Sequence, residues 1–324
     1  MSAKEAQAPV YENTNGVPLC NGKNLHMDVG LGDIANRIIT VGSESRAEKI
    51  AASFDGDELN LKRIKSSRGF TTITGTFNGV PVSTVAIGMG PAMMDFFVRE
   101  TRAVVEGPMA IIRYGTCGGL TEAASAGSIV VATDGSGYIS RNPDAFAACY
   151  SSGSASVSDS ADASSSTAVD DDTAAPSSSS SLAAQQAPKY RLAQIAPANK
   201  ELSELMISSL KEHIPDDVPI RTGANVTADS FYSSQGRLDP AFDDGNLDIA
   251  DIVKAKYPTI QTMEMETFFL LHLAACCKVP IKAAAAAIVV ANRPTGKVMD
   301  GGLLDVLECD GGEAMLEALT NLTL

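Results

Sequence analysis

The chain has 324 residues, a formal net charge of -14 and 44% hydrophobic residues, so it can bury a large core, while its acidity argues against non-specific binding to nucleic acid. No apolar run reaches the roughly 18 residues that a membrane span needs, and the N-terminal MSAKEAQAPVYENTNG lacks the apolar core of a secretory signal. Its six cysteines are irregularly spaced, so we expect reduced thiols and a cytoplasmic protein.

In its first half the chain alternates short β-rich runs with helical patterns. Asn78-Gly79 separates two such runs within residues 70–88, and this dipeptide is a strong hairpin signal. In chain order the predicted elements are a strand over 37–42, a helix over 44–54, the hairpin over 70–88, and strands over 108–115 and 127–135.

Residues 151–188 differ sharply in composition from the rest of the chain. They are almost entirely Ser, Ala and Asp, with no Lys or Arg. Such a stretch cannot bury enough apolar surface to offset its chain entropy. We therefore expect a disordered Ser/Asp-rich insertion, most simply one without chemistry, although its serines also permit phosphorylation. Residues 1–22 are expected to form a flexible N-terminal tail.

The second half returns to the alternation of strands and helices. In chain order the predicted elements are a helix over 199–214, a strand over 220–231, a buried helix over 265–279, a strand over 281–292 and a last helix over 311–322. The strand over 281–292 is ambiguous, because its alanine run favours a helix. Together these elements predict a single α/β domain over 1–324, with helices in layers around a central mixed sheet.

Two expected strand ends carry candidate anion ligands. Gly42 permits close backbone approach, and Arg46 follows in a first helical turn, where a cation opposes the helix dipole and therefore points to a function. Arg113 and Thr116 lie in RYGTCGGL, which lacks the P-loop and dinucleotide patterns and suits one small oxyanion. Cys117 is a candidate nucleophile there, but no histidine can be placed beside it, so a buried inert thiol is the simpler interpretation.

A third loop, DSFYSSQGR, carries side chains suited to a flat heterocycle. Gln235 and Arg237 are one residue apart and together offer donors and an acceptor in a plane. They can contact a ring edge that bears carbonyls and an N–H, while Phe231 can stack on the ring face. The alternative interpretation is a polar loop beside a core aromatic.

A fourth segment, TMEMETFF, places two glutamates around Met265 at a strand-to-helix junction. Acids in a first helical turn are ordinary partners of the helix dipole. A glutamate buried among apolar residues instead needs a partner, such as sugar hydroxyls. The spacing of Glu264 and Glu266 prevents both from facing the same ligand.

Taken in order, these motifs resemble the nucleoside phosphorylase family and, within it, the uridine phosphorylases. The matching segments, from about His26 to Arg293, are GSESRAEKI, SRGFTT, GMG, RYGTCGG, DSFYSSQGRLD, MEMET and ANR. Each motif alone is moderately specific, whereas the ordered set is strongly specific. The FYxxQGRLD form is similar to the eukaryotic enzymes.

The resemblance implies reversible phosphorolysis of uridine and of its 2′-deoxy analogue in pyrimidine salvage, with inorganic phosphate as co-substrate and no cofactor. It also implies sites shared between subunits, because Arg68 and His26 match residues that the family donates to the neighbouring site. The implied phosphate ligands are Gly42, Arg46, Arg68, Arg113 and Thr116. The implied ribose ligands are His26, Met265 and Glu266, and the base ligands are Phe231, Gln235, Arg237 and Arg293. Of these, the resemblance gives catalytic roles to Arg113, Gln235, Arg237 and Glu266.

Two departures from the family patterns refine this expectation. Asn292-Arg293 stands where purine-specific relatives carry a catalytic aspartate, which favours a pyrimidine. Gly69 stands where bacterial relatives have a glutamate that helps bind an interfacial cation, so we expect no metal and a homodimer rather than a hexamer.

The alternatives to a uridine phosphorylase are a nucleosidase that uses water, a purine-type phosphorylase, and a catalytically silent relative that binds nucleosides.

Overall fold

The computed structural model describes residues 13, 15–151 and 188–324. Their contacts separate two compact units. The larger comprises Met1–Ser140 with Leu192–Leu324, and the smaller comprises Arg141–Arg191.

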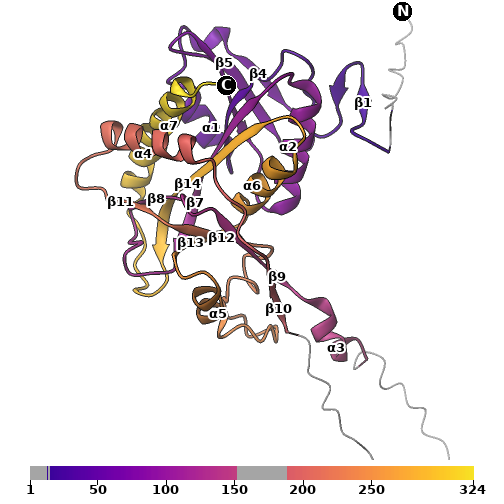
Figure 1. The fold of residues 1–324 in the computed structure, drawn as a ribbon, viewed down its shortest axis with the longest axis vertical. Coiled ribbons are helices and arrows are strands. Elements are labelled where there is room, and N and C mark those ends of the chain that lie inside the picture. Colours follow the sequence, from indigo (N-terminus) through magenta and orange to yellow (C-terminus); the bar gives the residue numbers. More distant parts are fainter. Residues whose placement is uncertain (1–12, 14, 152–187) are drawn as a thin grey trace, which may run out of the picture. The chain divides into compact units, whose positions relative to one another are not determined.

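A mixed β-sheet forms the centre of the larger unit (Figure 1). Its strands are β3 (Arg37–Val41), β4 (Lys62–Lys65), β5 (Thr71–Phe77), β6 (Val80–Ala86), β7 (Met109–Gly119), β8 (Ile129–Val131), β9 (Ser136–Arg141), β11 (Ile220–Thr222), β12 (Ala224–Ala228), β13 (Ile260–Glu264) and β14 (Ile281–Asn292). Neighbouring strands follow the order β9-β12-β13-β7-β3-β6-β5-β4, while β14 pairs with β7 and β8, and β8 also pairs with β11. A separate ribbon pairs β1 (Leu19–Cys20) with β2 (Lys23–Asn24).

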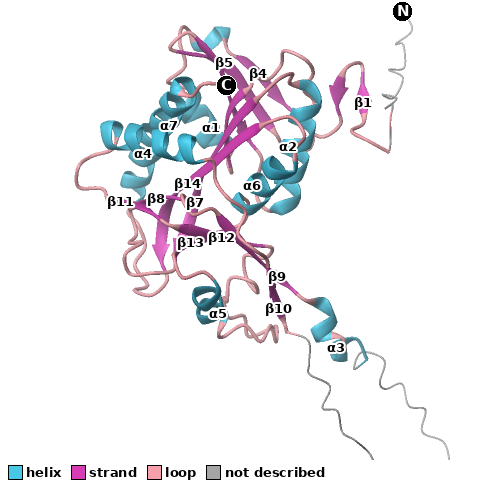
Figure 2. Cartoon of the chain, viewed as in Figure 1, coloured by secondary structure: helices cyan, strands magenta, loops and turns pink. Residues whose placement is uncertain are grey.

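Helices cover both faces of this sheet (Figure 2). They are α1 (Glu44–Ala51), α2 (Pro91–Val104), α4 (Lys200–His213), α6 (Thr267–Cys276) and α7 (Gly301–Asn321). The unit also contains the helix α5 (Ile249–Lys256) and a 3₁₀ turn η1 (Glu58–Asn60). One apolar cluster joins α1, α4 and α7 to Ile39 and Ile112, and a second joins α2 and α6 to Ile38 and Ile111. Successive strand residues thus enter opposite cores, as strand geometry requires. This arrangement confirms the predicted α/β class with a central mixed sheet between helical layers.

The alanine-rich segment 281–292 is a strand, which resolves its ambiguity. It is parallel to β7 over the whole strand, with Ile281 beside Met109 and Asn292 beside Gly119. Five consecutive alanines, 283–287, are buried. A strand buried on both faces needs no polar alternation, and its place in the sheet overrides the helical propensity of alanine.

Most predicted elements are confirmed, including the hairpin with Asn78-Gly79 at its turn, but three predictions were wrong in extent. The strand predicted over 108–115 is longer than expected, because β7 continues to Gly119 and so includes the small residues that follow Arg113. The single strand predicted over 220–231 is two strands, β11 and β12, which are separated by Gly223 at φ +151° and pair with different neighbours.

The third difference is that α7 begins at Gly301, ten residues before the predicted helix over 311–322. The Gly311-Gly312 pair lies inside this helix, where glycine is intrinsically unfavourable. A Cβ on Gly311 would collide with the hydroxyl of Tyr114, and one on Gly312 would lie 2.5 Å from Cγ1 of Ile50. The two glycines therefore allow β7 and α1 to pack closely against α7.

The smaller unit contains η2 (Pro143–Phe146), α3 (Ala148–Ser151) and part of β10 (Tyr190–Leu192). In it, the guanidinium of Arg141 lies 3.9 Å from the ring centroid of Phe146. Most of the insertion predicted over 151–188 and the first half of the predicted tail over 1–22 lie outside the described residues. The limits of the predicted single domain stay a prediction. Among the helices that the structure describes, none is both long and apolar enough to cross a membrane.

Candidate active site

A buried ion pair lies beside the end of β3. Arg113 on β7 donates from Nη2 to Oε2 of Glu266 at 2.7 Å, and the two side chains are 5% and 4% exposed. Glu266 is the N-cap residue of α6, and its Oε1 accepts the backbone N–H of Gly90 at 2.6 Å. Tertiary packing thus brings together two predicted site residues that are 153 positions apart in the sequence.

Arg113 retains donor capacity beyond this pair. Its Nη1 reaches the carbonyl of Thr40 only at 3.4 Å, and its Nε is buried without a hydrogen-bond partner. A Cβ on Gly115 would lie 3.5 Å from Nε and Cζ, and one on Gly42 would lie 3.7 Å from Nη2, so both glycines keep this guanidinium uncovered by side chains. Buried donors are almost always paired in proteins, so this arrangement suits an oxyanion.

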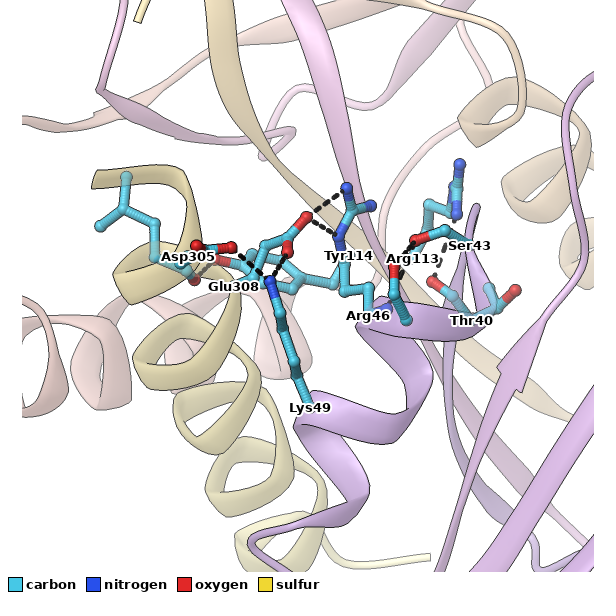
Figure 3. A network of polar contacts seen from close by, with 10 residues as sticks. Thr40, Ser43, Arg46, Lys49, Arg113, Tyr114, Asp305 and Glu308 are labelled. Carbon is cyan, nitrogen blue, oxygen red and sulfur yellow. Dashed lines mark hydrogen bonds and ion pairs between the residues drawn. The ribbon is translucent and has the colours of Figure 1, made fainter. Parts of the chain in front are cut away.

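Arg46 contacts a different carboxylate (Figure 3). The Oγ of Ser43 caps α1 by accepting the backbone N–H of Arg46 at 3.3 Å. The Arg46 side chain then extends to α7, where Nε and Nη2 both lie 2.8 Å from Oε1 of Glu308. Lys49, one turn later, donates to Oε2 of Glu308 at 2.6 Å and to Asp305 at 2.5 Å. Hydrogen bonds to Asp305 and Glu308 raise the pKa of Lys49.

Glu308 is a residue that the sequence reasoning missed. It lies in the part of α7 that was not predicted to be helical, and no motif marks it. A buried cation such as Arg46 needs a buried partner, so the sequence signalled that a partner exists without identifying it.

Glu264 fixes the junction between β13 and α6. Its Oε1 accepts hydrogen bonds from Asn225 Nδ2 at 2.8 Å and Thr227 Oγ1 at 2.6 Å. Its Oε2 accepts the backbone N–H groups of Glu266 and Thr267, each at 2.9 Å. Burial, and next the charge of Glu266, raise the pKa of Glu264. The two glutamates thus have different hydrogen-bond partners within the chain.

The predicted base-binding residues meet in one cluster. The guanidinium of Arg237 lies 3.6 Å from the ring centroid of Phe231, and its Nη1 donates to Gln235 Oε1 at 2.5 Å and to the Phe231 carbonyl at 2.7 Å. Arg293 donates to the carbonyls of Gln235 and Gly236. Burial and the charge of Arg293 lower the pKa of Arg237. The face of Phe231 expected to stack on a heterocycle thus has a guanidinium as its partner in this structure.

Asn292 has a purely structural set of contacts. Its Nδ2 donates to the carbonyls of Thr121 and Ala124, both at 2.7 Å. Its Oδ1 accepts the backbone N–H of Thr295 at 3.0 Å and the Thr295 hydroxyl at 2.7 Å. These bonds fix the turn that follows β14 and so position Arg293 at its start.

Two predicted site residues lie apart from the Arg113 pair within this chain. His26 is held against α2, where its Nδ1 lies 2.5 Å from Oε1 of Glu100 and its ring stacks on Phe96 at a centroid distance of 4.0 Å. Arg68 is exposed in the turn between β4 and β5. In the described part of the chain neither is hydrogen-bonded to Arg113.

Thr116 and Met265 are near in sequence to Arg113 and Glu266 respectively. Thr116 is half-buried on β7, and Met265 is half-buried between the two glutamates. Cys117 is buried, and burial raises the pKa of its thiol, which agrees with an inert side chain. Within the described ranges, no three His, Cys, Asp or Glu side chains are grouped to hold a metal ion.

Comparison with known proteins identifies related chains. Residues 36–309 match the family model described as the phosphorylase superfamily. A solved uridine phosphorylase of the oomycete Phytophthora capsici is 38% identical with a TM-score of 0.81, and the match covers 97% of this chain and 100% of that one. A solved Trypanosoma brucei nucleoside phosphorylase, described as showing uridine phosphorylase activity, is 20% identical with a TM-score of 0.68, over 93% and 98% of the two chains. At that identity the likeness shows the fold alone.

A curated relative has a purine substrate in its name. The DeoD-type purine nucleoside phosphorylase of Streptococcus pneumoniae serotype 19F (strain G54) is 33% identical over 109 residues, which is 34% of this chain and 44% of that protein. The chain thus matches less than half the length of this relative.

Proposed function

The chain belongs to the phosphorylase superfamily, whose solved and curated relatives above are nucleoside phosphorylases, and on this premise we propose that it is a uridine phosphorylase. In this proposal it converts uridine or its 2′-deoxy analogue, together with inorganic phosphate, reversibly into uracil and (deoxy)ribose 1-phosphate. The role fits a cytoplasmic enzyme of pyrimidine salvage that uses phosphate as co-substrate and no further cofactor.

The proposal rests on the burial and the incomplete hydrogen bonding of the Arg113 guanidinium. Its guanidinium is buried, is paired on one side with Glu266, and retains an Nε donor without a partner. Glycines rather than side chains lie over it. An oxyanion that meets this guanidinium would lie next to the Glu266 carboxylate, which is the acceptor that a sugar hydroxyl requires.

These groups match the charges that phosphorolysis creates. As the bond between C1′ and N1 breaks, positive charge develops on the ribose and negative charge on the departing uracil. Phosphate held by Arg113 stabilises the first and forms the new bond to C1′, and its proton balances the uracil anion. Gln235 and Arg237 donate to the developing negative charge on the base. Donors that are in place before reaction stabilise the transition state more than the ground state.

Two observations support a pyrimidine over a purine, despite the purine enzyme among the relatives. Asn292, in the position of the purine-specific aspartate, is committed to backbone groups of two turns. Its neighbour Arg293 donates to the loop that carries Gln235. Neither side chain is an acid that can protonate a departing purine.

An absorbance assay with uridine and phosphate tests the proposal directly. We expect uracil release that requires phosphate and is much slower with inosine. Release without phosphate would indicate a nucleosidase, and preference for inosine a purine-type enzyme. A flat trace with uridine, deoxyuridine and thymidine would indicate a silent nucleoside-binding relative.

Recognition of the base gives a sharper test of the same site. Gln235→Ala and Arg237→Ala each remove a proposed uracil contact, so each should reduce kcat/KM for uridine by about 10²–10³-fold. Each should also lower the ratio of kcat/KM for uridine to kcat/KM for inosine. Arg99→Met, which changes an exposed pair on α2, is the control. An unchanged ratio of uridine to inosine in both variants would contradict the assignment of this cluster to the base.

We further propose a homodimer whose sites are completed by Arg68 and His26 of the neighbouring subunit. A mixture of Arg68→Ala and Arg113→Ala chains tests this. Random exchange makes half the dimers mixed, each with one complete site, so about a quarter of wild-type activity should return from two inactive variants. Absence of recovery after verified subunit exchange would show that Arg68 acts within its own chain.

A further inference from the structure

The Arg46 guanidinium is held along one edge only. Its Nε and Nη2 both lie 2.8 Å from Oε1 of Glu308 (Figure 3), and the two side chains are 9% and 8% exposed. Among the described residues no group is hydrogen-bonded to Nη1. Since arginine can bind a second acceptor along its terminal edge, the contact with Glu308 fixes the guanidinium plane and leaves donors for another acceptor.

Lys49 satisfies the other side of the same carboxylate. It donates to Oε2 of Glu308 at 2.6 Å and to Asp305 at 2.5 Å. A carboxylate bonded at both oxygens cannot rotate freely, so Arg46 meets one fixed acceptor. The four side chains carry two positive and two negative charges, which leaves the cluster neutral without any contribution from an anion.

A direct bond between α7 and β7 fixes the location of Glu308. The Tyr114 hydroxyl donates to the carbonyl of Leu307 at 2.6 Å, and the absence of a side chain on Gly311 makes room for the Tyr114 ring. Tyr114 follows Arg113 on β7, and Leu307 precedes Glu308 on α7. The backbone positions from which Arg113 and Glu308 project are thus tied together by one buried hydrogen bond.

We propose that Glu308 is a positioning residue of the phosphate site, which rests on the function proposed above. It holds Arg46 by its Nε edge, so that the terminal guanidinium edge contacts the oxyanion that Arg113 binds. Lys49 keeps the Glu308 carboxylate in place. The start of α7 is in this way part of the site although it touches no substrate.

Direct binding of inorganic phosphate, measured by calorimetry, tests this without relying on turnover. Glu308→Ala should weaken phosphate binding by about 10–100-fold, the range found for outer partners that orient a ligating residue, and the KM for uridine should stay within about twofold. Glu308→Gln should lose less, because an amide oxygen still accepts from Arg46. Glu48→Gln, which alters an exposed pair on α1, is the matched control and should bind phosphate as wild type does.

A double-mutant cycle with Arg46→Ala separates positioning from a structural role. If Glu308 acts through Arg46, its replacement has no further effect on phosphate binding once Arg46 is absent. Equal losses in both backgrounds would overturn the proposal, as would wild-type affinity in Glu308→Ala. If Glu308→Ala does not fold, Glu308→Gln takes its place in the cycle. Failure of wild-type protein to bind phosphate would instead overturn the proposed function, so the two failures are distinguishable.

Discussion

Replacing Arg113 by methionine should lower both the stability and the activity of the protein, and the two losses can be measured separately. Methionine fills a similar volume but leaves the carboxylate of Glu266, 4% exposed, without its cation. Among the described residues, the Gly90 N–H at 2.6 Å would be the one remaining partner of this carboxylate. A buried charge that loses its partner is strongly unfavourable.

The expected loss is about 3–5 kcal/mol of the free energy of unfolding. Adding Glu266→Gln removes the stranded charge, and the amide oxygen can still accept the Gly90 N–H. The double variant should therefore keep only the cost of an amide with a missing partner, about 1–3 kcal/mol. Activity should not return, because both variants lack the phosphate donor, and each should lose about 10²–10³ in kcat/KM.

Urea unfolding followed by circular dichroism, with the uridine assay in parallel, measures both effects. Arg99→Met breaks an exposed pair with Asp95 and should cost under about 1 kcal/mol. If Arg113→Met unfolds like that control, Arg113 and Glu266 do not form the buried pair described. If the double variant regains phosphorolysis, Arg113 is not the phosphate ligand.

Three further changes give independent expectations. Asn292→Asp places a carboxylate against two backbone carbonyls that now accept from Nδ2 at 2.7 Å, so it should lower the free energy of unfolding by at least about 1–3 kcal/mol. The variant should have no activity with inosine, and a gain of inosine phosphorolysis would contradict the structural role of Asn292. Gly311→Ala should lower the free energy of unfolding by about 1–3 kcal/mol through overpacking against Tyr114. Gly301→Ala, whose added Cβ meets nothing within 4 Å, should leave it nearly unchanged, and equal unfolding midpoints of the two variants would show that α7 does not pack as described. Lys49→Met should be less stable than wild type below pH 10.5, because the carboxylate partners of Lys49 raise its pKa above 10.5. The difference in thermal midpoint between the two proteins should shrink as the pH rises through this raised pKa. A difference that grows over the same pH range would refute the ion pairs.

Local sequence patterns predicted helices and strands correctly where the spacing of apolar residues indicates that one face of the element is buried. The helices over 44–54 and 199–214 and the hairpin around Asn78-Gly79 are present. The patterns failed where tertiary contacts override local preference. The glycine pair at 311–312 argues against a helix interior, and the close packing of Tyr114 and Ile50 against α7 explains it.

The candidate site was predictable in residue type but not in pairing. The motifs identified Arg46, Arg113 and Glu266, and the structure shows each of them buried. They did not identify Glu308, because the start of α7 carries no motif. They also gave no sign that the Arg237 guanidinium lies over the ring of Phe231.

The sequence by itself determined that this is an α/β protein of a phosphorylase type, because periodicity and short ordered motifs are local properties of the chain. Only the tertiary structure decided which charges meet. The partners of Arg113 and Arg46 lie 153 and 262 positions away, and such contacts depend on strand order and helix packing. The energy of a buried charge requires that a partner exist, but only the folded chain shows that these partners are Glu266 and Glu308.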